Sequence, residues 1–194
     1  MMLPVVAARA CALGALMLLA ACTATERRKS AEATSSGAAE FTRIAQVLKS
    51  PRCINCHPAG NSPHQGDEAR VHDFRVTRGP ADHGAPGMNC STCHQENNQE
   101  SSGVPGAHHW QLAPMSMAWE GLSDAELCRT LLDQSKNGGR SVADLVHHMT
   151  EDPLVKWGWA PGVQRTPPPI AHEEFLELVR AWAARGAGCP DAPG

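Results

Sequence analysis

Tyrosine is absent from this 194-residue chain, and phenylalanine occurs only three times. Large aromatic side chains normally supply much of the apolar surface that a core buries. A chain with so few of them must obtain apolar surface from elsewhere, including a bound group. Basic residues do not outnumber acidic ones, since the formal net charge is −3. This balance argues against nucleic acid as a partner.

Apolar runs of membrane-spanning length are missing as well. The main apolar stretch, residues 11–21, is too short to cross a bilayer as a helix. Arg9 is the only charge before residue 26, so residues 1–21 are typical of an export signal. Leu19-Ala-Ala-Cys22 resembles a bacterial lipobox and predicts lipidation of Cys22, which would anchor the chain to a membrane. The alternative is an ordinary signal peptidase site with an incidental cysteine.

Two copies of one five-residue pattern are present, Cys53-Ile-Asn-Cys-His57 and Cys90-Ser-Thr-Cys-His94. Cys-x-x-Cys-His is the attachment signature of a c-type haem. Its two thiols bond to the vinyl groups of one porphyrin, and its histidine ligates the iron. The sequence therefore predicts two covalently bound haem c groups. Their attachment residues would be Cys53, Cys56, Cys90 and Cys93, and their iron ligands His57 and His94.

Cys-x-x-Cys also occurs in redox dithiols and in zinc sites. A zinc site of four thiolates would leave both trailing histidines unexplained. A thioredoxin-like dithiol needs a βαβ context, and no strand pattern lies nearby. Haem attachment is the interpretation that uses every residue of both motifs.

Export agrees with the predicted chemistry, because c-type haem is attached outside the bacterial cytoplasm. It also gives each cysteine a role. Of the eight cysteines, Cys11 lies in the signal, Cys22 takes lipid and four take haem. The remaining pair, Cys128 and Cys189, is predicted to form a disulfide in an oxidising compartment. The alternative is two buried free thiols. The expected location is the periplasm, with the lipid anchor in a membrane and the outer membrane favoured.

Residues 22–40 are polar and are expected to form a flexible tether. Residues 41–194 are expected to form one domain, mainly α with long irregular loops. Helices are predicted from Phe41, from a cap at Ser123, from a cap at Ser141 and after the proline run at 167–169. A short helical turn is expected around residues 67–73.

The spacing of the motifs indicates one domain rather than two. Cys53 and Cys90 are 37 positions apart. Two fused monohaem domains would separate them by a whole small domain, about 80–100 residues. Both haems must therefore share one core and lie close together, which suits electron transfer between them. The same spacing counts against a dihaem peroxidase, which needs two domains and a longer chain.

The second axial ligand of each iron decides its chemistry, because histidine lowers the potential, methionine raises it and an open position permits catalysis. The chain after Cys22 contains eight further histidines and four methionines. His72 is the first candidate, since it lies fifteen positions past His57 and within reach of either ring. Met117, in an apolar stretch, and His148, on a predicted helix, follow at about equal rank.

Several segments are similar to proteins known as an isoquinoline 1-oxidoreductase subunit, and they cover nearly all of the chain from Phe41 onward. They are Cys53–Pro58, Arg78–Gly79, Met88–Gln95, Leu112–Gly121, Asn137–Arg140, Asp152–Trp159 and Gly186–Pro190. The resemblance implies a c-type cytochrome that accepts electrons from an exported molybdenum hydroxylase acting on N-heterocycles or aldehydes. The chain itself has no cysteines left for iron–sulfur clusters and is too small to enclose a molybdopterin.

The function expected from the sequence is therefore single-electron transfer by a lipid-anchored dihaem cytochrome, from such a hydroxylase to a respiratory acceptor. On this interpretation the chain is not an enzyme, although it could be the electron-accepting subunit of one. The alternatives are a haem peroxidase or reductase and a ligand sensor, each with one open haem site.

Overall fold

The computed structural model describes residues 37–191. The expected signal peptide, the lipidated Cys22 and most of the expected tether lie outside this range. The described part is mainly helical with long loops, as the sequence predicted. Its helices are α2 (Ala38–Leu48), α3 (Pro51–Ile54), α4 (Asp124–Leu132), α5 (Val142–Glu151), α6 (Pro153–Trp157) and α7 (His172–Ala184). None of these helices has both the length and the apolar composition that a bilayer span requires.

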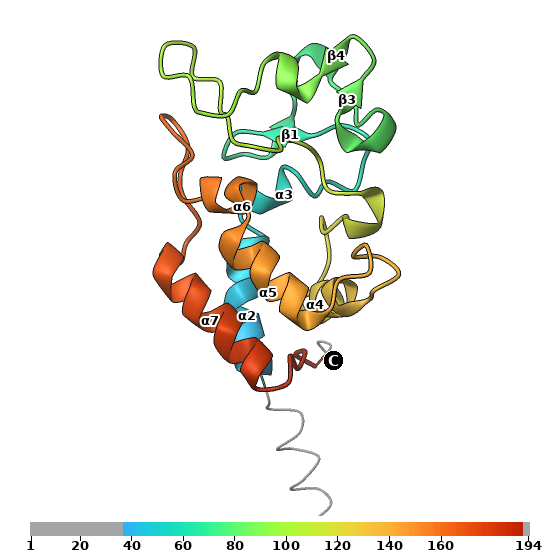
Figure 1. Cartoon of the computed structure of the whole chain (residues 1–194), viewed down its shortest axis with the longest axis vertical. Coiled ribbons are helices and arrows are strands. Elements are labelled where there is room, and N and C mark those ends of the chain that lie inside the picture. The colour runs from blue at the N-terminus through green and yellow to red at the C-terminus, as the bar shows by residue number, and fades with distance from the viewer. Residues whose placement is uncertain (1–36, 192–194) are drawn as a thin grey trace, which may run out of the picture. The chain divides into compact units, whose positions relative to one another are not determined.

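Strands are very short in the described residues and form two antiparallel pairs. The first pair is β1 (His64–Gln65) with β2 (Arg70–Val71), and the second is β3 (Gly84–Ala85) with β4 (Met88–Asn89). Single 3₁₀ turns cover residues 73–75, 80–82, 90–92 and 115–117. All of these elements lie in the long segment between α3 and α4 (Figure 1).

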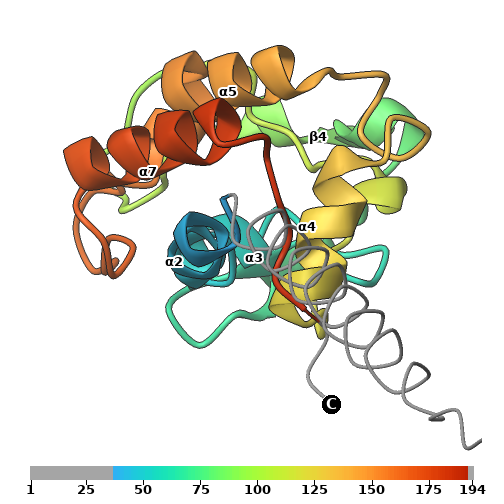
Figure 2. The ribbon, with the colours of Figure 1, turned by 90° about the horizontal axis from the view of Figure 1, so that it is seen from below.

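The helices at the two ends of this unit build its core. Helix α2 contacts both α7 and α4, and α5 contacts α7. Figure 2 shows α2 between α7 and α4. Phe41 on α2 and Trp182 on α7 are fully buried, with ring centroids 5.5 Å apart. Burying such large side chains stabilises this pair of helices by a few kcal/mol, at roughly 2 kcal/mol for each.

Side-chain caps mark the start of α4 and of α5, as the sequence predicted. Ser123 and Glu126 form a reciprocal capping box at the start of α4, and Ser141 and Asp144 do the same for α5. Each box satisfies two backbone N–H groups that would otherwise lack partners. Helix α2 begins at Ala38 rather than Phe41, because the preceding alanines and glutamate are good helix formers.

The prediction of a helical turn around residues 67–73 is wrong. A tight hairpin occupies this stretch, with β1 and β2 joined by a turn at residues 66–69. Gly66 and Ala69 have φ values of 75° and 47°, which reverse the chain and cannot continue a right-handed helix. The local polar sequence gave no strand periodicity, because each strand is only two residues long.

A disulfide joins Cys128 on α4 to Cys189 after α7, the pair left over in the cysteine count. Their Cα atoms are 5.6 Å apart, and 61 positions separate them in the sequence. Cys128 is fully buried in the helical core. The bond therefore ties the C-terminal end of the described chain to the core.

Candidate functional site

The first motif begins inside α3, which contains Cys53 and Ile54. Ser50 precedes the helix and Pro51 occupies its first turn, where a missing N–H costs nothing. The turn continues past the helix, since Cys56 N donates to Cys53 O at 3.0 Å. Residues three apart in such a turn lie on the same face. The motif thus presents both thiols to one side, as attachment to a single ring requires.

The second motif has a similar backbone without a long helix before it. A 3₁₀ turn begins at Cys90, and the backbone N–H groups of Cys93 and His94 both donate to Cys90 O, at 3.2 and 2.9 Å. Cys90 N in turn donates to His83 O at 2.9 Å. These bonds hold the motif as a compact turn at the end of the β3–β4 hairpin.

The two motifs are neighbours in space. Burial is the main cause that raises the pKa of Cys56, and the negative charge of a Cys90 thiolate raises it further. One later segment bridges the surroundings of both motifs, because Leu112 N donates to Asp82 O and Ala113 N donates to Cys56 O, each at 3.0 Å. Groups attached at the two motifs would therefore lie close together.

His57 is held in the form that binds a metal. Its Nδ1 lies 2.7 Å from Met117 O, and its ring stacks on Trp119 with centroids 3.3 Å apart. Burial lowers the pKa of His57 to about 3, against the opposing effect of this hydrogen bond, and the charges of His148 and Arg78 lower it further. At neutral pH the imidazole is uncharged and donates its Nδ1 proton to the carbonyl. Its Nε2 lone pair is then free for iron.

His94 repeats this arrangement at the second motif. Its Nδ1 lies 2.8 Å from Pro105 O, and its ring stacks on Trp110 with centroids 4.5 Å apart. Burial is the main cause that lowers the pKa of His94. Gly106 follows Pro105 and leaves no room for a side chain, because a Cβ there would lie 2.3 Å from the carbonyl oxygens of Gln95 and Asn97.

Trp110 and Trp119 were missed by the sequence analysis, although each stacks on a motif histidine. No local pattern marks them, since stacking on a distant ring has no periodicity along the chain. Trp110 also meets the edge of Trp157, with centroids 4.8 Å apart, and Trp157 Nε1 donates to Asn98 Oδ1 at 2.8 Å. The second motif is therefore backed by an aromatic pair.

Three of the four motif thiols differ from those of a redox dithiol. Burial raises the pKa of Cys53 to about 12 and that of Cys56 to about 11. Burial also raises the pKa of Cys90. Catalytic dithiols instead have lowered pKa values that favour the thiolate. Within residues 37–191, no group of three or more His, Cys, Asp or Glu side chains is arranged to hold a metal ion.

Buried donors around the first motif fit the carboxylates of a haem. The Nε atoms of Arg52 and Arg78 and the Nε1 of Trp119 are buried and have no hydrogen-bond partner within the described residues. Unpaired buried N–H groups are costly, so each needs an acceptor. Both guanidinium groups already hold one carboxylate, Asp67 for Arg52 and Asp82 for Arg78. Their remaining N–H groups suit the propionates that a haem carries.

The three candidate second ligands lie in different surroundings. The ring of His72 lies 5.9 Å from that of His94, measured between centroids. The Met117 side chain is buried in the helical core. The Met117 carbonyl accepts a hydrogen bond from Nδ1 of His57, so the backbone of Met117 contacts the Nδ1 side of that ring. His148, on α5, lies near enough for its charge to act on His57.

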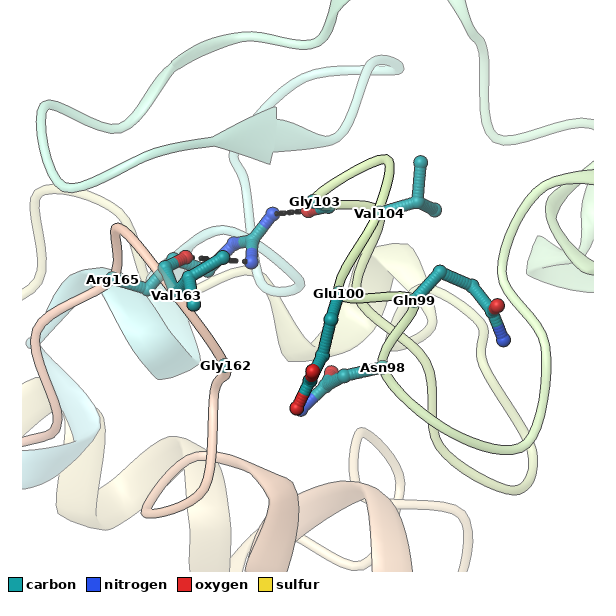
Figure 3. A pocket seen from close by; sticks show the side chains of 8 residues that line it. All are labelled: Asn98, Gln99, Glu100, Gly103, Val104, Gly162, Val163 and Arg165. Atoms are coloured by element: carbon teal, nitrogen blue, oxygen red, sulfur yellow. Dashed lines mark hydrogen bonds between the residues drawn. The ribbon is translucent and has the colours of Figure 1, made fainter.

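Two clefts border this region. One, of about 590 Å³, includes His109, His147 and His148 in its lining. The other, of about 300 Å³, lies between residues 98–104 and residues 162–165 (Figure 3). Arg165 closes its edge by donating to Gly103 O at 2.5 Å, and its charge also lowers the pKa of His94. No residue predicted from the sequence as part of the site lines this second cleft.

No protein-family model matches the chain, and neither a curated protein nor a solved structure matches it.

Proposed function

We propose that residues 41–194 form a dihaem c-type cytochrome that carries single electrons. The observation that carries this proposal is shared by both motifs: a neutral histidine donates Nδ1–H to a backbone carbonyl and stacks on a tryptophan. Metal-ligating histidines are oriented in this way by a partner behind the ring. Bound haem would supply reversible one-electron chemistry at both sites.

The chain's own residues would bind and tune the two groups. Cys53, Cys56, Cys90 and Cys93 would form the thioethers, and His57 and His94 would hold the irons. The carbonyls of Met117 and Pro105 keep the imidazoles oriented and raise their basicity as ligands. Arg52 and Arg78 would bind propionates and offset their charge. The closeness of Cys56 and Cys90 would give electrons a short path between the haems.

The proposed donor is an exported molybdenum hydroxylase, and the proposed acceptor is a respiratory protein. The sequence segments that resemble the isoquinoline 1-oxidoreductase subunit support the donor. Loss of Arg9 with the signal would leave 16 basic and 20 acidic residues, before the propionates add more negative charge. Such a surface suits transient docking on a basic partner.

One observation favours the alternative of a haem enzyme or ligand sensor with an open iron. The cleft of about 590 Å³ contains His148, whose charge acts on His57. A small molecule in this cleft would lie near the first motif. The spin state and carbon monoxide binding of the haems distinguish this alternative from a carrier.

The deciding experiment uses the full chain, expressed with the machinery that attaches c-type haem. We expect two covalent haems per chain, low-spin ferric optical and EPR spectra, and no carbon monoxide binding after reduction. These properties follow if both irons have two axial ligands. Absence of covalent haem would contradict the cytochrome proposal. A high-spin fraction that binds carbon monoxide would instead favour the enzyme or the sensor.

The lipid anchor, which we include in the proposal, predicts a change of location. Cys22→Ala should move the protein from the membrane fraction to the soluble fraction, because the acylated residue is lost. Cys11→Ala is the matched control, since this cysteine lies in the expected signal and should leave the anchor intact. Immunoblots of separated membranes measure both variants. A Cys22→Ala protein that stays membrane-bound would rule out lipidation as the anchor.

A further inference from the structure

We infer that His72 is the second axial ligand of the iron held by His94. This inference rests on the proposed dihaem function and deepens it. It assigns one iron a pair of histidines, which places that haem at the low-potential end of such cytochromes.

The distance between the two rings is the first support. The centroids of His72 and His94 lie 5.9 Å apart, with the ring planes at 72°. Metal–imidazole bonds are about 2 Å long, so two imidazoles on opposite sides of one metal have centroids about 6 Å apart. Within the described residues, His72 is the one other histidine whose ring pairs with the ring of a motif histidine.

The ring nitrogens give the second support. Nδ1 of His72 lies 2.7 Å from the carbonyl oxygen of Asp73, and Nδ1 of His94 lies 2.8 Å from that of Pro105. With both Nδ1 protons donated to carbonyls, each ring keeps its Nε2 lone pair for a metal. Both histidines thus have the tautomer that a shared iron needs.

The hairpin holds His72 in position. His72 directly follows β2, and its backbone N–H donates to Pro63 O at 2.9 Å. The next residue, Asp73, accepts from Arg70 at 2.7 Å and from Gln65 at 2.8 Å. Arg70 and Gln65 belong to the two strands of the hairpin, so the turn that carries His72 is braced from both.

Two exposed apolar side chains near His72 in the sequence could pack against a porphyrin. Val71 is 60% exposed and Phe74 is 82% exposed, and both lie within two positions of His72. Phe74 also has a φ of 61°, a costly conformation for a bulky residue. A porphyrin between His72 and His94 would offer an apolar face that these two side chains could contact. The free-energy cost of the strained Phe74 backbone would then be offset by the burial of apolar surface.

The test compares His72→Ala with His83→Ala in the haem-loaded protein. His83 is an exposed histidine of the same inter-motif segment. Its contact with the second motif is made by its backbone carbonyl, which accepts a hydrogen bond from Cys90 N. His72→Ala should keep both thioether-bound haems, while one of the two irons becomes high-spin and binds about one equivalent of carbon monoxide per chain. Added imidazole should restore the low-spin spectrum. His83→Ala should match the parent protein.

A His72→Met variant gives a second readout in case alanine lowers the haem content. Methionine ligation should keep the iron low-spin and raise the potential of one haem only. Unchanged spectra and potentials in the His72 variants, with two haems still attached, would overturn the inference and leave the cytochrome proposal standing. Absence of covalent haem in the parent protein would instead contradict the proposed function itself.

Discussion

A variant with both Cys90 and Cys93 replaced by alanine should carry one covalent haem instead of two. Thioether bonds need these thiols, and a haem held by His94 alone would be lost on denaturation. Intact mass under denaturing conditions should fall by about one haem, and the pyridine haemochrome absorbance should fall about twofold relative to the parent. Retention of two covalent haems would contradict the assignment of this motif.

The Cys53→Ala, Cys56→Ala variant is the matched comparison, and it should differ in stability. Cys53 and Ile54 pack against the helical core, whereas Cys93 is exposed. Loss of the first haem should therefore lower the thermal midpoint of the helical far-UV signal more than loss of the second. Equal midpoints would show that the first motif does not support the core.

Replacing both Cys128 and Cys189 with alanine should lower the free energy of unfolding by roughly 4 kcal/mol. The disulfide closes a loop across 61 sequence positions, so breaking it returns much conformational freedom to the unfolded chain. This loss is a large part of the about 5–15 kcal/mol that stabilises a typical domain. Urea unfolding followed by circular dichroism measures it.

Haem content is the control for the disulfide variant. The Cys128–Cys189 bond joins α4 to the segment after α7, whereas the haem motifs lie in α3 and after β4. Both covalent haems should therefore remain, and reduction of the parent protein should reproduce the lower stability. A change below about 1 kcal/mol would mean that the bond hardly restricts the unfolded chain.

Four of the six helices in the described residues could be predicted because their signals are local, whereas the short helices α3 and α6 were not predicted. Ser123 and Ser141 are each followed three residues later by the acidic partner of a capping box, and both boxes form. Gly186 comes just after α7 and has a φ of 93°, a conformation that glycine adopts readily at the end of a helix. The disulfide followed from counting cysteines by chemical role. Each of these inferences needs only neighbouring residues or composition.

The surroundings of the motif histidines could not be predicted in the same way. Trp119 lies 62 positions after His57, and its stacking depends on the course of the whole chain between these two residues. That course is set by tight turns with positive φ at residues such as Ala69 and Ala81, which have no sequence signature. The carbonyl partners, Met117 O and Pro105 O, are backbone atoms and carry no residue preference.

The segment that closes over both motifs also sets an order of events for a newly made chain. Trp110, Trp119 and the two carbonyls that accept from the motif histidines all come later in the sequence than His94. A chain exported amino end first would therefore present all four thiols outside the cytoplasm before the segment that covers them has crossed the membrane. Attachment enzymes would meet open motifs during this interval, and completion of the segment would then seal each histidine behind its tryptophan.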